Sequence, residues 1–193
     1  MPELPLRERK KRETRDRIYS SAVYLFQKQG YEETSIEQIT QKANVGKGTF
    51  YNYFISKEEV VMEFSTKGFK NVLTSVRERP YLGVRERLNT FLQDWVAFMV
   101  DNQEMAWVTV RNRVSADYDL GLHYGIQAII NAGQENYEIS CSFDSAFLAE
   151  SLEGMMLQHF ISWYVSREGN LFEEMKLVLS IFFDSLIETK LRA

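Results

Sequence analysis

Residues 34–57 read TSIEQITQKANVGKGTFYNYFISK. The hydroxyl of Thr34 or Ser35 can accept a hydrogen bond from a free amide of a first helical turn, so either residue can begin a helix here. Apolar side chains then recur at the spacing of one helical face, which predicts a helix over 35–43: Ile36, Ile39, Ala43 and, beyond it, Val45. Asn44 and Gly46 tolerate turn or left-handed backbone conformations. The stretch therefore predicts two short helices joined by a tight turn, the second beginning near Gly46 or Lys47.

The second predicted helix has two different faces. Phe50 and Phe54 lie four residues apart, so they share one side and pack inward with Val45. The other side carries a cation, a hydroxyl, an amide and two phenols, on Lys47, Thr49, Tyr51, Asn52 and Tyr53. Lysine and tyrosine suit phosphate contacts, whereas asparagine and the threonine methyl group can read bases. An ordinary solvated surface, with the tyrosines covering a small core, is the alternative that periodicity alone leaves open.

Two segments carry a family resemblance: GYEETSI at 30–36 and GKGTFYNYFISK at 46–57, with Ile39, Ala43 and Val45 between them. From about Arg15 to Val61 the chain resembles the tetracycline-repressor (TetR) family of bacterial transcriptional regulators. One departure is Gly46, where the family more often has serine. The missing hydroxyl puts one phosphate contact or helix cap in question, not the resemblance.

The resemblance implies a set of DNA-contacting residues. In this set Lys47, Gly48 and Thr49 begin the recognition helix that enters the major groove, and Lys57 clamps a phosphate at the start of the next helix. Ammonium and aromatic hydroxyl contacts to phosphate do not depend on which operator is read, which favours Lys47, Tyr51 and Lys57. The implied contacts are Thr34, Ser35, Lys47, Gly48, Thr49, Tyr51, Asn52, Tyr53 and Lys57.

The distribution of charge agrees with a DNA-binding N-terminus. The 193 residues have a formal net charge of -4, which argues against a general nucleic-acid coat. However, residues 1–57 contain 11 basic and 7 acidic side chains, against 12 and 20 in residues 58–193. A frayed, solvated terminus is the alternative for the basic arm, and residues 1–8, with Pro2 and Pro5, are expected to form a flexible lead-in. The arm consists of Arg7, Arg9, Lys10, Lys11, Arg12, Arg15 and Arg17.

Helical periodicity extends over the whole chain. A first helix is predicted from about Lys10 to Gln29, ended by Gly30, and no strand-like alternation is sustained. With the two short helices, further helices are predicted at about 56–79, 83–101, 103–114, 121–137, 143–167 and 171–190. The fold class is therefore all-α, with about nine helices. We expect an N-terminal three-helix DNA-binding domain with a helix-turn-helix (1–55) and a larger C-terminal effector-binding and dimerisation domain (56–193).

The two last predicted helices carry apolar side chains on more than one face. A helix of this kind buries one face on its own core and the other on something else. The resemblance implies that the same two helices of a second subunit cover it, and a two-fold dimer sets two recognition helices roughly 34 Å apart, one DNA turn. Two intramolecular core faces are the alternative. The candidate interface residues are Phe147, Leu148, Phe172, Phe182 and Phe183.

The middle helices contain many large apolar side chains. The resemblance implies an effector pocket in this region, although such a stripe is also typical of plain core. If Arg111 faces inward, a ligand carboxylate or phosphate is expected, and if it faces outward, a hydrophobic or cationic ligand fits equally. The candidate effector-binding residues are Trp95, Trp107, Arg111, His123 and Phe160.

No constellation for catalysis or metal binding stands out. Residues 46–49 lack the glycine spacing of a phosphate-binding loop, and His123 and His159 have no partner at metal-ligand spacing. Cys141 is the only cysteine, which excludes an internal disulfide and fits a reducing cytoplasm. The longest apolar run, 95–100, is far shorter than the roughly 20 residues of a membrane span. We therefore expect no enzyme activity, cofactor, metal or membrane partner.

Together these features predict a cytoplasmic, ligand-responsive DNA-binding regulator. We expect a repressor that binds a pseudo-palindromic double-stranded DNA operator as a homodimer and is released by an unknown small-molecule effector. The alternative is a helical interaction protein, or one that sequesters a small molecule, whose DNA-binding domain is vestigial.

Overall fold

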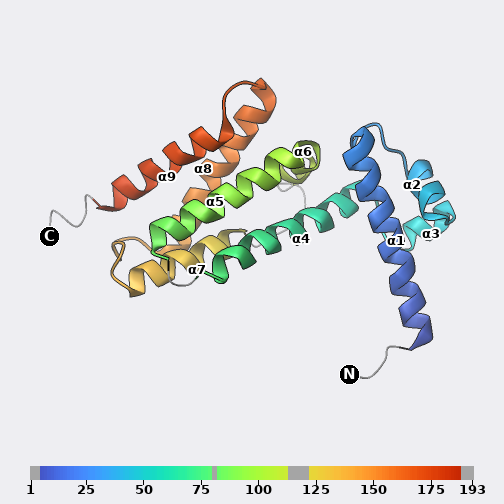
Figure 1. Ribbon diagram of the computed structural model, residues 1–193, viewed down its shortest axis with the longest axis horizontal. Coiled ribbons are helices and arrows are strands. Elements are labelled where there is room, and N and C mark those ends of the chain that lie inside the picture. The colour runs from blue at the N-terminus through green and yellow to red at the C-terminus, as the bar shows by residue number, and fades with distance from the viewer. Residues whose placement is uncertain (1–4, 80–81, 113–121, 188–193) are drawn as a thin grey trace. The chain divides into compact units, whose positions relative to one another are not determined.

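The computed structural model describes residues 5–79, 82–112 and 122–187, which within these ranges form nine α-helices and no strand (Figure 1). The all-α prediction is therefore confirmed. The helices are α1 (Leu6–Gln29), α2 (Ile36–Ala43), α3 (Lys47–Tyr51), α4 (Lys57–Arg77), α5 (Val84–Asp101), α6 (Gln103–Asn112), α7 (Leu122–Glu135), α8 (Ser145–Ser166) and α9 (Leu171–Ile187).

The chain divides into two compact units. The first unit, which we call the head, consists of the residues up to Thr66 together with Glu104–Arg111. The second unit, the body, consists of Lys67–Gln103 and the residues from Asn112 onward. The head thus reaches into α4, past residue 55, and takes in most of α6, which follows α5 in the sequence.

The first helix begins earlier than the sequence pattern suggested. It starts at Leu6, directly after Pro5, so the expectation of a flexible lead-in is wrong for residues 6–8. Proline fixes a backbone angle suited to a helix start and has no amide to leave unpaired. Exposed ion pairs four residues apart add support along this part of α1: Arg9 with Glu13, and Arg12 with Asp16.

The turn between α2 and α3 follows from the residue types predicted for it. Ser35 forms a capping box with Gln38: its hydroxyl accepts from the Gln38 amide at 3.2 Å, and the Gln38 side chain accepts from the Ser35 amide at 2.7 Å. Asn44 ends α2 in a left-handed conformation with φ of 52°. α3 is only one and a half turns long, and its last backbone bonds run from the amides of Tyr53 and Phe54 to the Phe50 carbonyl.

The core of the head contains the residues that periodicity selected. Phe50 and Phe54 are fully buried with their ring centroids 5.9 Å apart, which confirms their predicted inward direction. Tyr31 is also buried, with its ring 5.2 Å from that of Phe26. Two side chains of α6, Met105 and Val108, complete the core. The buried set is Ile18, Ala22, Phe26, Tyr31, Ile39, Ala43, Phe50, Phe54, Val60, Val61, Met105 and Val108, with Leu25, Ile36 and Val45 packed against it.

The body is a bundle in which α7 and α9 each pack against α5 and α8. Glycines allow two of its close approaches. A Cβ at Gly125 would lie 1.9 Å from the Leu73 Cδ2, and one at Gly68 would lie 2.1 Å from the Phe98 ring. Among the described helices, none combines the length and the apolar character that a membrane crossing requires.

Candidate DNA-binding surface and ligand pocket

The outer side of the α3 segment presents the polar groups predicted for it. Four of these residues are exposed, namely Lys47, Gly48, Tyr51 and Asn52, whereas Thr49 and Tyr53 are half-buried. The exposed side of residues 47–53, which form α3 and the turn after it, therefore carries two phenols, a cation, a hydroxyl and an amide. These groups together can donate to phosphates and read base edges.

Gly48 has a specific place on this surface. A Cβ there would meet no protein atom within 4 Å, so packing within the head does not call for glycine at this position. Glycine in a helix is less favourable than alanine by roughly 1 kcal/mol. Its presence suits a surface that another molecule approaches closely.

Lys47 forms an exposed ion pair with Glu37 of α2. The hydrogen bond to Glu37 raises the pKa of Lys47, and the same bond lowers the pKa of Glu37. Exposed pairs of this kind contribute little to stability because both groups are well hydrated. The Lys47 ammonium can therefore exchange a carboxylate for a phosphate at little cost.

Thr34 and Ser35 lie just before α2, and their hydroxyls form different hydrogen bonds. Thr34 is buried, and its hydroxyl donates to the Gly30 carbonyl at 2.7 Å. Ser35 is exposed and caps α2, with its hydroxyl accepting from the Gln38 amide. The side chain of Thr34 is thus held inside the head, while Ser35 remains at its surface.

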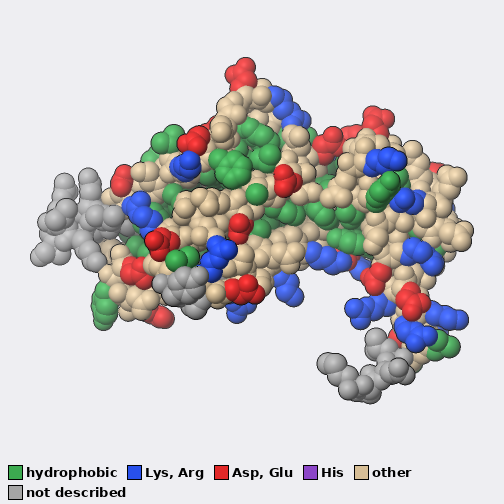
Figure 2. Space-filling model, in the orientation of Figure 1, with side chains coloured by type: hydrophobic (Ala, Val, Ile, Leu, Met, Phe, Trp, Pro, Cys, Tyr) green, Lys and Arg blue, Asp and Glu red, His purple; other side chains and the backbone are tan. Residues whose placement is uncertain are grey.

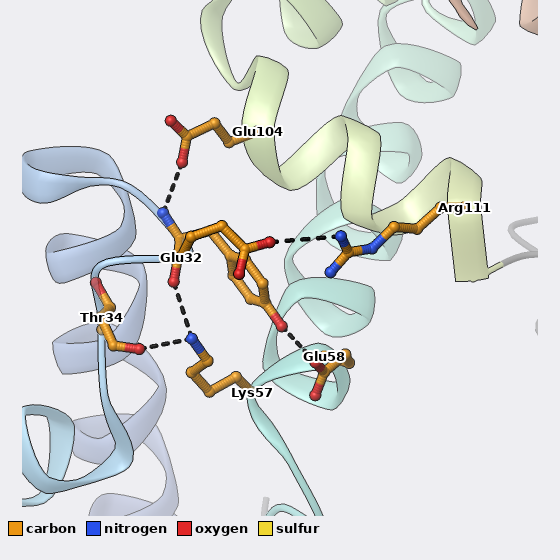
Figure 3. A network of polar contacts seen from close by, with 7 residues as sticks. Glu32, Thr34, Lys57, Glu58, Glu104 and Arg111 are labelled. Atoms are coloured by element: carbon orange, nitrogen blue, oxygen red, sulfur yellow. Dashed lines mark hydrogen bonds and ion pairs between the residues drawn. The ribbon is translucent and has the colours of Figure 1, made fainter.

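Lys57 is the centre of a polar cluster around Tyr31 (Figure 3). Its ammonium donates to the carbonyls of Tyr31 at 2.9 Å and Thr34 at 2.6 Å, and lies 4.3 Å from the centroid of the Tyr31 ring. The Tyr31 hydroxyl donates to Glu58 at 2.6 Å, and the Tyr31 amide donates to Glu104 of α6 at 2.7 Å. We call this set the Tyr31 cluster: Tyr31, Glu32, Thr34, Lys57, Glu58, Glu104 and Arg111.

Two groups of the Tyr31 cluster, the Tyr31 hydroxyl and the Glu58 carboxylate, have shifted pKa values. Burial raises the pKa of the Tyr31 hydroxyl, and the hydrogen bond to Glu58 raises it further. Burial alone would raise the pKa of Glu58, but the hydrogen bonds from Tyr31 and Ser56 outweigh it and the pKa is lowered. No pattern in the sequence indicated these partners.

The basic arm lies along the N-terminal half of α1, where Figure 2 shows Lys and Arg side chains gathered at the surface. Arg15 differs from the other basic residues of the arm because its side chain is bonded to other residues of the head. Its guanidinium donates to both carboxylate oxygens of Glu63, at 3.0 and 2.5 Å, and lies 4.7 Å from the centroid of the Phe54 ring. The exposed members are Arg7, Arg9, Lys10, Lys11, Arg12 and Arg17.

The five candidate effector residues fall in different units. Trp107 and Arg111 belong to the head, where Arg111 is exposed and pairs with Glu32 at 3.4 Å. Trp95 and Phe160 are fully buried in the body with ring centroids 6.2 Å apart. The Trp95 indole N–H has no hydrogen-bond partner in the described structure. His123, also in the body, is half-buried with its Nδ1 3.8 Å from the Glu153 carboxylate.

A cavity of about 330 Å³ opens in the body among α4, α5 and α7. Two arginines, Arg77 and Arg87, lie among its otherwise mainly apolar lining, and none of the five candidate effector residues lines it. The lining residues are Leu73, Arg77, Arg87, Tyr124, Gly125, Ala128 and Ile129.

The candidate dimer residues also divide into two groups. Phe147 is 59% exposed and Phe172 is 37% exposed, whereas Leu148, Phe182 and Phe183 are buried within the body. Other apolar side chains of the same two helices, which the sequence did not single out, are strongly exposed: Val165, Leu177 and Ile181.

The arrangement of α2, its turn and the exposed α3 is that of a helix-turn-helix motif. Residues 18–64 match the family model described as bacterial regulatory proteins, tetR family. Over this segment the chain is similar to the TetR family of transcriptional regulators.

Named regulators resemble this chain in sequence over part of its length, and solved structures resemble it in fold over most of it. The transcriptional regulator TcmR of Streptomyces glaucescens is 49% identical over 57 residues, which are 30% of this chain and 25% of TcmR. The matched segment thus spans about a quarter of that relative. FadR of Thermus thermophilus, a repressor solved with lauroyl-CoA, has a TM-score of 0.79 and 20% identity over 88% of this chain and 93% of its own. FadR of Bacillus subtilis, solved with stearoyl-CoA, has a TM-score of 0.68 and 18% identity over 86% and 96%.

Proposed function

We propose that this protein is a ligand-responsive transcriptional repressor of the cytoplasm that binds a pseudo-palindromic operator as a homodimer. The exposed side of α3 carries the proposal. There Lys47, Tyr51 and Asn52 are exposed, whereas the phenylalanine pair of the same segment is buried. A Cβ at Gly48 would meet no protein atom within 4 Å, so there is open space at this position. A small-molecule effector bound in the body releases the DNA by favouring a different spacing of the two heads.

A dimer accounts for the exposed apolar side chains of α8 and α9. On α8, Phe147 is 59% exposed and Val165 67%. On α9, Leu177 is 65% exposed and Ile181 64%. Apolar groups concentrated on adjacent helices mark an interaction surface. Two-fold pairing of this surface supplies the second head that a pseudo-palindrome requires.

A ligand-responsive body is supported by the cavity and by the similar structures. The two FadR proteins were solved with lauroyl-CoA and stearoyl-CoA. In the body of this chain, a cavity of about 330 Å³ has a mainly apolar lining with a few polar groups, which is the usual character of a small-molecule site.

Replacing Lys47 with alanine, or Tyr51 with phenylalanine, is expected to weaken operator binding roughly tenfold, because each removes a hydrogen bond to DNA phosphate. Lys47→Ala is also expected to reduce the slope of log affinity against log salt by about 1. The measurement is fluorescence anisotropy at several salt concentrations, with DNA from the neighbourhood of the protein's own gene.

Lys176→Ala is the matched control for Lys47→Ala, since Lys176 is an exposed lysine of the body that pairs with the exposed Glu173. It should bind DNA like the unaltered protein. Unchanged affinity in both head variants would contradict the assigned DNA surface. Absence of any competitor-resistant complex over the salt range would favour a helical interaction or sequestering protein instead.

The double substitution Leu177→Glu with Ile181→Glu is expected to convert the dimer to a monomer, because it places two charges on the apolar surface of α9. Sedimentation equilibrium would measure the mass. Ile55→Glu is the control, since Ile55 is an 82% exposed apolar residue of the head. A double variant that keeps twice the chain mass would show that α9 does not form the interface.

A further inference from the structure

We propose that the cavity among α4, α5 and α7 binds a small organic oxyanion with an apolar body, namely a carboxylate or phosphate monoester on a short hydrocarbon. This inference rests on the proposed function, since it names the chemical class of the effector. The occupant is held by Arg77 of α4 and Arg87 of α5, both of which line the cavity.

The two arginines lack partners in the part of the chain that the structure describes. No described acidic residue forms an ion pair with either guanidinium, and Arg87 Nε is buried without a hydrogen-bond partner. By contrast, the Arg15 guanidinium in the head donates two hydrogen bonds to the Glu63 carboxylate. Arg87 therefore carries positive charge that no described carboxylate compensates, and the exposed Arg77 adds a second positive charge at the same cavity.

An oxyanion is the ligand that such a pair of guanidinium groups recognises. A buried N–H without a partner is unfavourable, and supplying an acceptor removes that penalty. The planar fork of arginine matches the paired oxygens of a carboxylate or phosphate, and charge makes these hydrogen bonds stronger than neutral ones. A cationic ligand would be repelled, and a neutral one would leave the charge uncompensated.

The remaining lining residues determine which non-ionic part of a ligand the cavity can hold. Leu73, Ala128 and Ile129 offer aliphatic groups, and Tyr124 adds an aromatic ring that is itself exposed. At Gly125, the missing side chain lets α7 approach Leu73 of α4 closely at one wall of the cavity. A cavity of about 330 Å³ has room for the volume of about ten water molecules. A short fatty acid or its phosphate analogue is of this size.

Three probes with the same hydrocarbon test the class of ligand: octanoate, octyl phosphate and octanol. Each is titrated into the full-length protein by isothermal calorimetry, without DNA. Octanoate or octyl phosphate is expected to bind at least tenfold more tightly than octanol. Tighter binding of octanoate identifies a carboxylate head, and tighter binding of octyl phosphate a phosphate head. Equal binding of all three, or binding of none, would overturn the proposal.

Variants then test the residues. Arg87→Met is expected to weaken the preferred anion at least tenfold and Arg77→Met by a smaller factor, while Arg87→Lys, which keeps the charge without the fork, gives an intermediate loss. Lys70→Met removes an exposed charge of α4 outside the cavity and should bind normally. Ala128→Phe fills the cavity and leaves both arginines, so it is expected to abolish binding. Unchanged affinity in both Arg87→Met and Ala128→Phe would place the ligand elsewhere.

A parallel DNA-binding experiment separates this inference from the proposed function. If the anion binds in calorimetry and releases the DNA complex, both hold. If it binds but the protein has no affinity for DNA, or the DNA complex is unaffected, the site stands and the ligand-responsive repressor fails. If DNA binds but no anion does, the repressor proposal stands and the oxyanion site fails.

Discussion

Replacing Phe50 with alanine is expected to destabilise the head by about 3–5 kcal/mol, the range for deleting a fully buried phenylalanine ring. The side chain is 0% exposed and its ring meets those of Tyr51 and Phe54, at centroid distances of 5.5 and 5.9 Å. Because Phe50 lies on α3 itself, the cavity left by its removal loosens the helix that carries Lys47 and Tyr51. Urea unfolding followed by circular dichroism would measure the change, and operator affinity should fall with the folded fraction.

Two matched variants isolate the effect of Phe50. Phe50→Leu retains most of the buried volume and is expected to cost less than about 1.5 kcal/mol. Ile55→Ala removes an apolar side chain that is 82% exposed, so it should change stability by less than about 0.5 kcal/mol. An unfolding midpoint for Phe50→Ala equal to that of Ile55→Ala would show that α3 is not fixed by the buried ring.

Replacing Lys57 with methionine is expected to destabilise the head by about 2–3 kcal/mol, because hydrogen bonds from a charged donor to the Tyr31 and Thr34 carbonyls are lost. These carbonyls belong to the segment that leads from α1 into α2, so the loss should also speed hydrogen exchange in this segment. Unfolding and amide exchange of the Thr34 amide, which is bonded to the Tyr31 carbonyl at 3.3 Å, are the measurements.

Lys42→Met is the control for Lys57→Met. The Lys42 ammonium lies 3.8 Å from the centroid of the exposed Tyr24 ring, so this change removes a cation over an aromatic ring at the surface. It should cost less than about 1 kcal/mol. If Lys57→Met weakens DNA binding with no change in stability or exchange, the ammonium acts on phosphate, as the family resemblance implies, and its bonds to the loop are dispensable.

Local features of the head could be predicted from the sequence. The capping box of Ser35 and Gln38 and the inward pair Phe50 and Phe54 depend on residues three or four positions apart, which helical spacing relates directly. The Tyr31 cluster could not be found in this way. Tyr31 meets Lys57 26 residues later and Glu104 73 residues later, and no periodicity connects such positions.

The body shows a second limit of sequence patterns. Periodicity predicts that α9 has apolar groups on more than one face, but it does not say which face the rest of the same unit covers. In the structure Phe182 and Phe183 are buried within the body, while Leu177 and Ile181 remain exposed. The cavity with Arg77 and Arg87 was missed for the same reason, because the lateral arrangement of α4, α5 and α7 decides which charged side chains share a space.

The membership of α6 in the head has a consequence for the order of events during synthesis. Glu104 leaves the ribosome 73 residues after Tyr31, a delay on the order of 4–15 s at usual elongation rates. Until then a nascent head lacks Met105 and Val108 in its core and an acceptor for the Tyr31 amide. The core of the head is therefore complete only after α5 has been made, so its completion depends on prior synthesis of the helix that carries Arg87.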